Sequence, residues 1–222
     1  MKSLLFTIHT YIEEFLFGSR CAGCHTPGKA ICNRCLLSVP LSEETEHNSI
    51  YGLYNYGHPL VSHSIWNLKY RHRGQETKLL ATRAQELISE IIADALQSEK
   101  LEALTLVPIP QYKKKLQKRG FNQSETIAKW LSQSLPNSHV ENILEKIKET
   151  RPQSHLSDRR ARLRNIEGAM RSTKQLSRNK LYIVIDDVTT TGATFLEATR
   201  ALSSAGARNV LCIALAHGYK KR

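Results

Sequence analysis

Two pairs of cysteines near the start of the chain have the spacing of a metal site. Cys21 and Cys24 form one CxxC pair, and Cys32 and Cys35 form a second pair after seven intervening residues. Each pair can present two thiolates to one ion from a tight turn, and two pairs complete the tetrahedral coordination of structural zinc. Because four cysteines leave no open position for water, the pattern predicts a structural Zn²⁺ site rather than a catalytic one.

Other uses of these cysteines remain open. Disulfide bonds or redox-active thiols are the alternatives, although a reducing compartment disfavours disulfides. His25 could replace one ligand, but a place in the intervening loop suits it better. The fifth cysteine, Cys212, lies in an apolar run and is expected to be an inert core residue.

A second group of reactive side chains lies in the segment 183–194, which has the sequence IVIDDVTTTGAT. An apolar run ends in Asp186 and Asp187, and a loop of threonines and glycine then leads into a helical pattern. The amides of such a loop and the N-terminus of the helix point at one anion, and a glycine allows its close approach. The residues expected to bind a phosphate are Thr189, Thr190, Thr191, Gly192, Ala193 and Thr194.

The two aspartates cannot face that phosphate, because their negative charges would repel it. They are better placed to accept hydrogen bonds from sugar hydroxyls, and they could hold a divalent cation through water. A phosphate on one side and vicinal hydroxyls on the other describe a ribose 5-phosphate. The segment has neither the P-loop pattern nor the GxGxxG turn of dinucleotide sites. A structural alternative is that Asp186 and Asp187 only cap the strand.

Strand and helix patterns alternate around these residues. Strands are expected at 104–110, 181–186 and 209–216, and helices at about 76–96, 122–135 and 194–205. Gly206 is typical of a residue that ends a helix. This alternation predicts an α/β fold, in which a parallel sheet is covered by helices on both faces.

The chain is strongly basic. Its 222 residues include 32 Lys and Arg against 20 Asp and Glu, which gives a net charge of +12, and 41% of the residues are hydrophobic. This composition is that of a globular protein and excludes a disordered or coiled-coil main state. The charge is concentrated in the segments 113–119 and 146–180, and such an excess indicates a polyanionic partner. Candidate DNA-binding residues in the first segment are Lys113, Lys114, Lys115, Lys118 and Arg119.

The N-terminal segment, residues 1–18, has apolar residues at helical spacing and is expected to form an amphipathic helix that docks on the rest of the protein. It lacks the pattern of a secretory signal, so a cytoplasmic location is expected. No apolar run in the sequence reaches the ~20 residues of a membrane span.

An aromatic patch follows the cysteines. Its rings could stack a nucleobase or the bases of single-stranded DNA, but packing of the fold is the commoner use of aromatic side chains and is favoured here. The patch consists of Tyr51, Tyr54, Tyr56, Trp66 and Tyr70.

The segment IVIDDVTTTGAT resembles the phosphoribosyl-pyrophosphate (PRPP) signature of type I phosphoribosyltransferases. The wider pattern is similar to that of the ComF family, over nearly the whole chain. The resemblance rests on the four-cysteine head, LKYRHRG at 68–74, VPIP and RGFNQSE within 107–125, TRPQSHLSDRRARLRN at 150–165, and the acid-pair loop, in that order. Members of that family are associated with natural transformation, in which DNA is taken up and handled inside the cell.

The resemblance implies an N-terminal helix with a zinc-binding module at 1–46 and a type I phosphoribosyltransferase-like domain at 47–222, with a hood-like segment at 47–75. It implies PRPP bound with Mg²⁺, and Asp186 and Asp187 as the catalytic pair. The loop after the first core strand would bind pyrophosphate through Pro108, Ile109, Pro110, Gln111 and Tyr112. A flexible loop would close over the site and exclude water through Arg151, Gln153, Arg159, Arg160 and Asn165.

Three functions follow as hypotheses. The first is a ComF-like competence protein that acts in DNA uptake through a PRPP-binding domain. The second is a Mg²⁺-dependent phosphoribosyltransferase of nucleotide metabolism or salvage without a direct DNA role. The third is a non-catalytic, PRPP-regulated adaptor that binds single-stranded DNA through the two basic segments. In the DNA-handling roles, the zinc module would dock a DNA-uptake, helicase or recombination protein.

Overall fold

The computed structural model describes residues 20–42, 45–47, 49–71, 73–96, 103–149 and 165–218, and it describes the backbone alone at 45–47. The expected N-terminal helix and the C-terminal residues Lys220, Lys221 and Arg222 lie outside the described residues. So does most of the arginine-rich loop, with Arg151, Gln153, Arg159 and Arg160.

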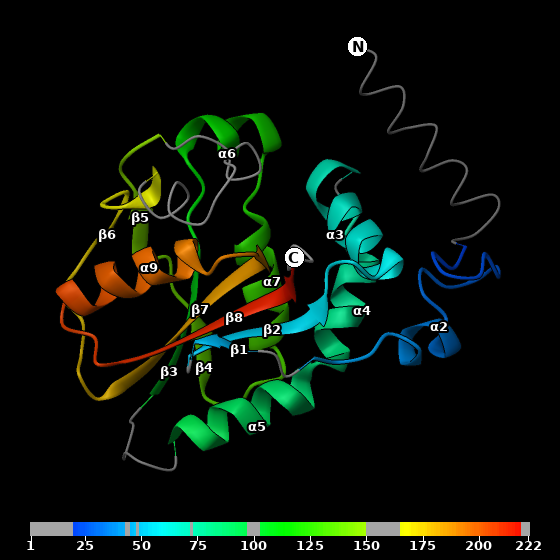
Figure 1. Ribbon diagram of the computed structural model, residues 1–222, viewed down its shortest axis with the longest axis horizontal. Coiled ribbons are helices and arrows are strands. Elements are labelled where there is room, and N and C mark those ends of the chain that lie inside the picture. Colours follow the sequence, from blue (N-terminus) through cyan, green and yellow to red (C-terminus); the bar gives the residue numbers. More distant parts are fainter. Residues whose placement is uncertain are drawn as a thin grey trace.

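A six-stranded sheet forms the centre of the molecule, in the order β1-β2-β8-β7-β3-β4 (Figure 1). Five of these strands are parallel, and β1 is antiparallel to β2 at one edge. A separate antiparallel pair joins β5 and β6. The main strands are β1 (Thr45–His47), β2 (Ile50–Asn55), β3 (Ala103–Pro108), β4 (Ser138–Val140), β7 (Lys180–Thr189) and β8 (Asn209–His217); the small pair is β5 (Leu144–Lys146) and β6 (Met170–Ser172). The predicted α/β class with a parallel sheet is therefore confirmed.

Helices cover both faces of this sheet. One face is covered by α3 (Pro59–Arg71), α4 (Gln75–Arg83), α5 (Gln85–Leu96) and α7 (Gln123–Ser132), and the other by α9 (Ala193–Ser204) (Figure 1). Two short helices remain among the described residues: α2 (Asn33–Leu37) lies in the cysteine module, and α6 (Lys113–Arg119) follows β3.

The alternation of side chains along β7 explains the two layers. Leu181, Ile183 and Ile185 join the core under α3, α4, α5 and α7, whereas Tyr182 and Val184 join the core under α9. Because successive strand residues point to opposite faces, a continuous apolar run is what a strand buried on both sides requires.

The strand order reverses between β3 and β7. The chain leaves β3 through α7 to reach β4 on one side, and it leaves β7 through α9 to reach β8 on the other side. Since α7 and α9 cover opposite faces, the carboxyl ends of β3 and β7 form a topological switch point. Open α/β sheets bind their ligands at such a switch point.

The observed elements differ from the sequence-based expectations in two places. The helix expected at 76–96 is two helices with a break at Ala84, which is buried in the core. The strand expected to end at Asp186 continues to Thr189, because Val188 and Thr189 pair with Ala216 and His217 of β8.

The aromatic patch is divided between core and surface. Tyr54 is fully buried, and its hydroxyl donates a hydrogen bond to the Leu80 carbonyl at 2.9 Å. Trp66 and Tyr70 are exposed on α3. Packing therefore accounts for Tyr54 but not for the two rings on α3.

Candidate functional site

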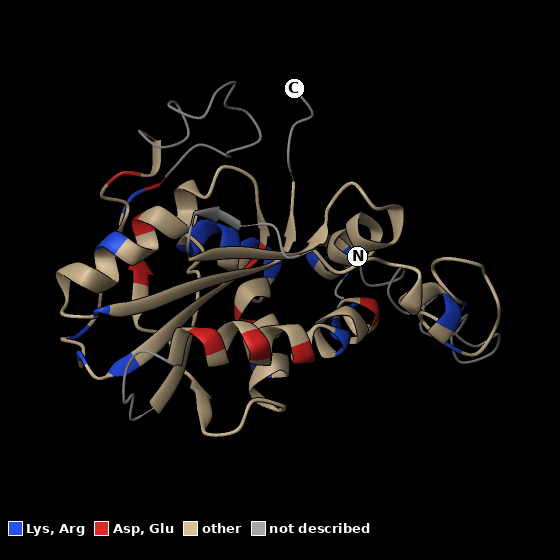
Figure 2. Cartoon of the chain, turned by 60° about the horizontal axis from the view of Figure 1, so that its bottom comes forward, with Lys and Arg blue, Asp and Glu red and all other residues tan. Residues whose placement is uncertain are grey.

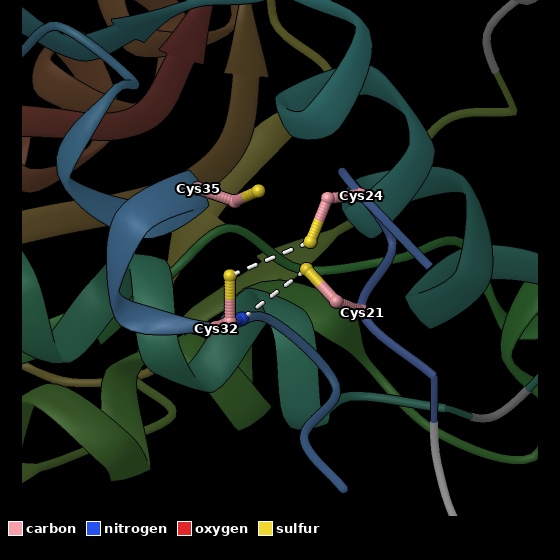
Figure 3. A group of neighbouring side chains, drawn as sticks. All are labelled: Cys21, Cys24, Cys32 and Cys35. Carbon is pink, nitrogen blue, oxygen red and sulfur yellow. Dashed lines mark hydrogen bonds between the residues drawn. The ribbon is translucent and has the colours of Figure 1, made fainter. Parts of the chain in front are cut away.

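The four paired cysteines lie together, as their spacing predicts. Their sulfur atoms all lie within 4.8 Å of one another (Figure 3), and the Sγ atoms of Cys24 and Cys32 are 3.6 Å apart. A tetrahedral zinc with bonds of about 2.3 Å separates its sulfur ligands by about 3.8 Å, so the cluster fits this ion. The Cys32 amide also donates to the Cys21 sulfur at 3.2 Å. This cluster could hold a metal ion.

The electrostatics of the cluster favour a bound cation. The pKa of Cys24 is lowered to about 5, first by the hydrogen bond from the Thr26 hydroxyl. The pKa of Cys35 is raised to about 12, first by its interaction with Cys32 and then by burial. Four thiols in contact thus resist ionising together, and a central cation would stabilise all four thiolates.

The cysteine module is joined closely to the helical layer. A Cβ atom on Gly23 would lie 2.8 Å from the Cys35 sulfur and 3.1 Å from a methyl group of Leu60 on α3, so only glycine fits. Arg83 of α4 donates hydrogen bonds to the carbonyls of Val39 and Leu37. Cys21 belongs to the same buried core as the helices.

The second site lies where β7 reaches the carboxyl edge of the sheet. Asp186 is half-buried there, and its Oδ1 accepts hydrogen bonds from the Ser124 hydroxyl at 2.8 Å and from the Asp187 amide at 2.9 Å. Burial, followed by the charge of Asp187, raises the pKa of Asp186 to about 7. Asp186 therefore changes its charge near neutral pH.

Asp187 has a cationic partner. Its Oδ2 lies 2.9 Å from the Lys69 ammonium, and the two side chains are only 13% and 21% exposed. Burial alone would lower the pKa of Lys69, but the attraction of Asp187 outweighs it and the net pKa is raised. Lys69 thus holds a positive charge at the acid pair.

Further lysines border the same edge. Burial and the nearby charge of Lys115 lower the pKa of Lys146, and Asp186 partly offsets this. Lys146 is the last residue of β5, and Lys115 lies on α6. The acid pair therefore lies among cations from α3, β5 and α6, an arrangement that suits a ligand with several negative charges.

The threonine loop follows the acid pair. Gly192 has a φ of +67° and occupies the N-cap of α9, where its left-handed conformation turns the chain into the helix. The Thr191 hydroxyl is buried and has no hydrogen-bond partner among the described residues. An unpaired buried hydroxyl beside a helix N-terminus is what a phosphate-binding loop offers.

The loop after β3 lies at the same switch point. The Ile109 amide donates to the Ile185 carbonyl at 2.9 Å, and the Asn122 side chain donates to the Ile109 carbonyl at 2.9 Å. Gln111 donates to Gln123, which leaves Gln111 Oε1 and Gln123 Nε2 buried without partners in the described part of the chain. The predicted residues Pro108–Tyr112 therefore border the acid pair.

The structure brings together most of the residues predicted for the site. One edge of the sheet holds the acid pair Asp186 and Asp187, the threonine loop and residues 108–112. Asn165, the first residue of the described range 165–218, is half-buried. Sequence reasoning missed Lys69, Ser124 and Lys146 as site residues. Lys69 lies within the motif LKYRHRG and Ser124 within RGFNQSE, so these two motifs could have indicated them as site residues. Lys146 lies outside both motifs.

These observations define a class: an α/β protein with a ligand site at the switch point of a parallel sheet and a four-cysteine module packed on its helical layer. The chain belongs to the ComF family. DNA utilization protein YhgH of Salmonella typhimurium is 30% identical over 197 residues, covering 86% of this chain and 81% of that protein. Competence protein F of Haemophilus influenzae is 27% identical over 204 residues, covering 86% of each chain. No protein-family model matches the chain.

Among the helices of the described residues, none combines the length and the apolar character that crossing a bilayer would need.

Proposed function

We propose that the switch point between β3 and β7 binds PRPP. The observation that supports the proposal is that three groups lie together there, each of which matches one part of PRPP. The loop Thr189–Thr194 would hold the 5-phosphate, with the Thr191 hydroxyl as one donor. Asp186 and Asp187 would accept hydrogen bonds from the ribose hydroxyls, and the loop Pro108–Tyr112 would face the pyrophosphate.

The cations around the acid pair support a pyrophosphate ligand. Lys146 and Lys115 lie close enough to each other to lower the pKa of Lys146, and a bound anion would relieve their repulsion. Bound Mg²⁺ would supply further neutralisation of the pyrophosphate charge. The carboxylates of Asp186 and Asp187 are oxygen groups of the kind that Mg²⁺ prefers.

We further propose that this chain acts in the uptake and utilisation of DNA in the cytoplasm. The names of its relatives, Competence protein F and DNA utilization protein YhgH, support a role in handling DNA. In this role the four-cysteine module would hold a structural Zn²⁺ and dock a protein of DNA uptake, unwinding or recombination. The division into a module at 1–46 and a phosphoribosyltransferase-like domain at 47–222 is part of this proposal.

A second candidate function is phosphoribosyl transfer to a nitrogen base. It is favoured by the pKa of Asp186, which burial raises to about 7, because a general base is most effective near the working pH. In this reaction the base nitrogen would form a bond to C1 of the ribose as the bond to pyrophosphate breaks, pyrophosphate would leave with the electron pair of that bond, and the proton on the nitrogen would pass to the Asp186 carboxylate.

A third candidate, direct binding of single-stranded DNA, is favoured by α6. Its sequence is KKKLQKR, and Lys113, Lys114, Lys115 and Lys118 are all exposed. Lys114 forms an ion pair with Glu149 at 3.0 Å, on the surface of the molecule. A helix with this charge attracts a phosphate backbone.

Calorimetry of the protein with PRPP and Mg²⁺ tests the first proposal. We expect binding in the wild type and its loss in Asp186→Ala/Asp187→Ala. Asp94→Ala, which removes an exposed acid of α5, is the matched control and should bind normally. Binding that survives the double substitution would contradict the site. Release of pyrophosphate with any of a panel of nucleobases would establish transfer, and binding without release would favour a regulatory ligand.

Binding of an oligothymidylate at several salt concentrations tests the DNA role. We expect the affinity to fall steeply with salt, and Lys113→Gln/Lys114→Gln/Lys115→Gln should reduce the slope by about 0.7 for each lysine that binds a phosphate in the wild type. The same change at the exposed residues Lys29, Lys78 and Lys129 is the control for net charge. An affinity indifferent to salt would contradict a phosphate-based interface.

A further inference from the structure

Two aromatic rings are exposed side by side on α3. Trp66 is 43% exposed and Tyr70 is 60% exposed. The spacing of four residues places them on one face of the helix, with ring centroids 5.6 Å apart and planes tilted by 45°. Exposed apolar side chains that lie next to each other, unlike those scattered singly, can mark a binding site.

A guanidinium group lies over each ring. Arg71 of α3 lies 4.9 Å from the centroid of Trp66, and Arg119 of α6 lies 5.5 Å from the centroid of Tyr70. Arg119 thus connects the aromatic pair to the basic helix, and α3 and α6 lie at the same end of the molecule (Figure 1). We call Trp66, Tyr70, Arg71 and Arg119 the aromatic platform.

The surroundings of the platform are positively charged. Arg119 ends α6, whose four lysines are exposed. Figure 2 shows the contrast with α5, a helix of the same layer as α3, along which Asp and Glu are spaced. Rings that can stack bases, next to cations that can bind phosphates, are the two components of single-strand recognition.

We propose that the aromatic platform is the base-stacking subsite for single-stranded DNA. This rests on the proposed DNA binding by α6 and adds to it a contact with the bases. The strand's phosphates would follow α6 while one or two bases stack on Trp66 and Tyr70.

The platform also borders the acid-pair site. Lys69 lies between Trp66 and Tyr70 in the sequence, and its ammonium contacts Asp187. On the other side, Arg119 donates to the Gln123 side chain at 2.7 Å, and the next residue, Ser124, donates to Asp186. A strand on the platform would therefore pass beside the proposed PRPP pocket.

The first test compares an oligothymidylate with an abasic strand of the same length. Only the former can stack, so we expect the wild type to prefer it by about 5- to 100-fold. Trp66→Ala/Tyr70→Ala should lose this preference and keep the weaker, salt-dependent binding of the abasic strand. Equal binding of both strands by the wild type would overturn the platform while leaving the phosphate contacts of α6 intact. Failure to bind either strand would overturn both proposals.

The second test uses Trp66 as its own reporter. The chain has two tryptophans, and Trp130 is half-buried, packed against Gly74. In Trp130→Phe, the remaining fluorescence comes from Trp66, and stacked thymines should quench it in proportion to the bound strand. Quenching by the abasic strand to the same extent, or by free nucleobases at equal concentrations, would contradict a strand-stacking subsite. A folded Trp66→Phe variant that retains Trp130 should not show this quenching. If its fluorescence is quenched by the oligothymidylate to the same extent, that result would contradict the subsite as well.

Discussion

The four-cysteine module and the acid-pair site differ in how the chain assembles them. All four cysteines come from residues 21–35, and their sulfur atoms meet within 4.8 Å through local turns. The acid pair instead depends on Lys69 of α3 and Ser124 of α7, which only the tertiary fold brings to β7. A site encoded by local spacing can therefore be predicted from sequence as a whole, whereas a site assembled by topology shows only its separate motifs there, and the fold alone shows that they meet.

Removal of zinc should have the largest effect. Binding of structural zinc is worth about 10–16 kcal/mol in isolated finger peptides, so the module should lose its order without the ion. We expect about one zinc per chain in the purified protein, and its loss in Cys32→Ala/Cys35→Ala should lower Tm by roughly 5–15 °C. Metal analysis and calorimetry check this.

Cys212→Ala is the control for the zinc prediction. Cys212 is buried in the core under α9, away from the cluster, and burial raises the pKa of its thiol to about 12. Zinc content should be unchanged in this variant. A folded wild-type protein that contains no zinc and melts at the same temperature as Cys32→Ala/Cys35→Ala would contradict a structural ion.

Breaking the Lys69–Asp187 ion pair should have the second largest effect. Asp187→Asn leaves a largely buried ammonium without its counter-ion and should lower the free energy of unfolding by about 1–3 kcal/mol. Lys69→Met in the same protein removes the unpaired charge and should restore part of the loss. Urea unfolding of the two single variants and the double variant measures the coupling, and simple additivity of the two effects would argue against the pair.

The charge of Asp186 predicts two opposite pH dependences. Because burial raises its pKa in the folded protein to about 7, from about 4 when unfolded, its contribution to stability falls as pH rises through this window. Affinity for PRPP with Mg²⁺ should instead rise with pH, by up to about tenfold per unit below the pKa. Asp186→Asn should flatten both profiles. Parallel rather than opposite profiles in the wild type would show that another group titrates.

Loss of the Ser124 hydroxyl should have the smallest effect. Ser124→Ala removes one hydrogen bond to Asp186, at a cost of about 0.5–1.5 kcal/mol in stability. Since this bond lowers the pKa of Asp186, the pH midpoint of PRPP binding should move upward. Ser132→Ala removes a hydroxyl from the exposed end of the same helix and should leave the midpoint in place. If the pH midpoint of PRPP binding does not move in Ser124→Ala, Ser124 does not contribute to the PRPP site.

The same distinction between local and long-range information explains how far sequence alone could lead. The apolar run 181–186 predicts a buried strand because its pattern is local, but the end of β7 depends on pairing with β8, so the local pattern ends it too early. The residues of the threonine loop that could bind a phosphate are consecutive, so the sequence alone shows them together. Lys146 has no local pattern that marks it, because its role arises from its proximity to Lys115 and Asp186.

The contact between Gly23 and Leu60 has a practical consequence for dissecting the protein. Cys21, Ile31 and Val39 of the module share one buried core with α3 and α4. A chain shortened to start at Ile50 would leave that part of the helical layer open to water, which favours aggregation. The cysteine module is therefore not a detachable accessory, and its partners should be sought by point substitutions on its surface rather than by deletion.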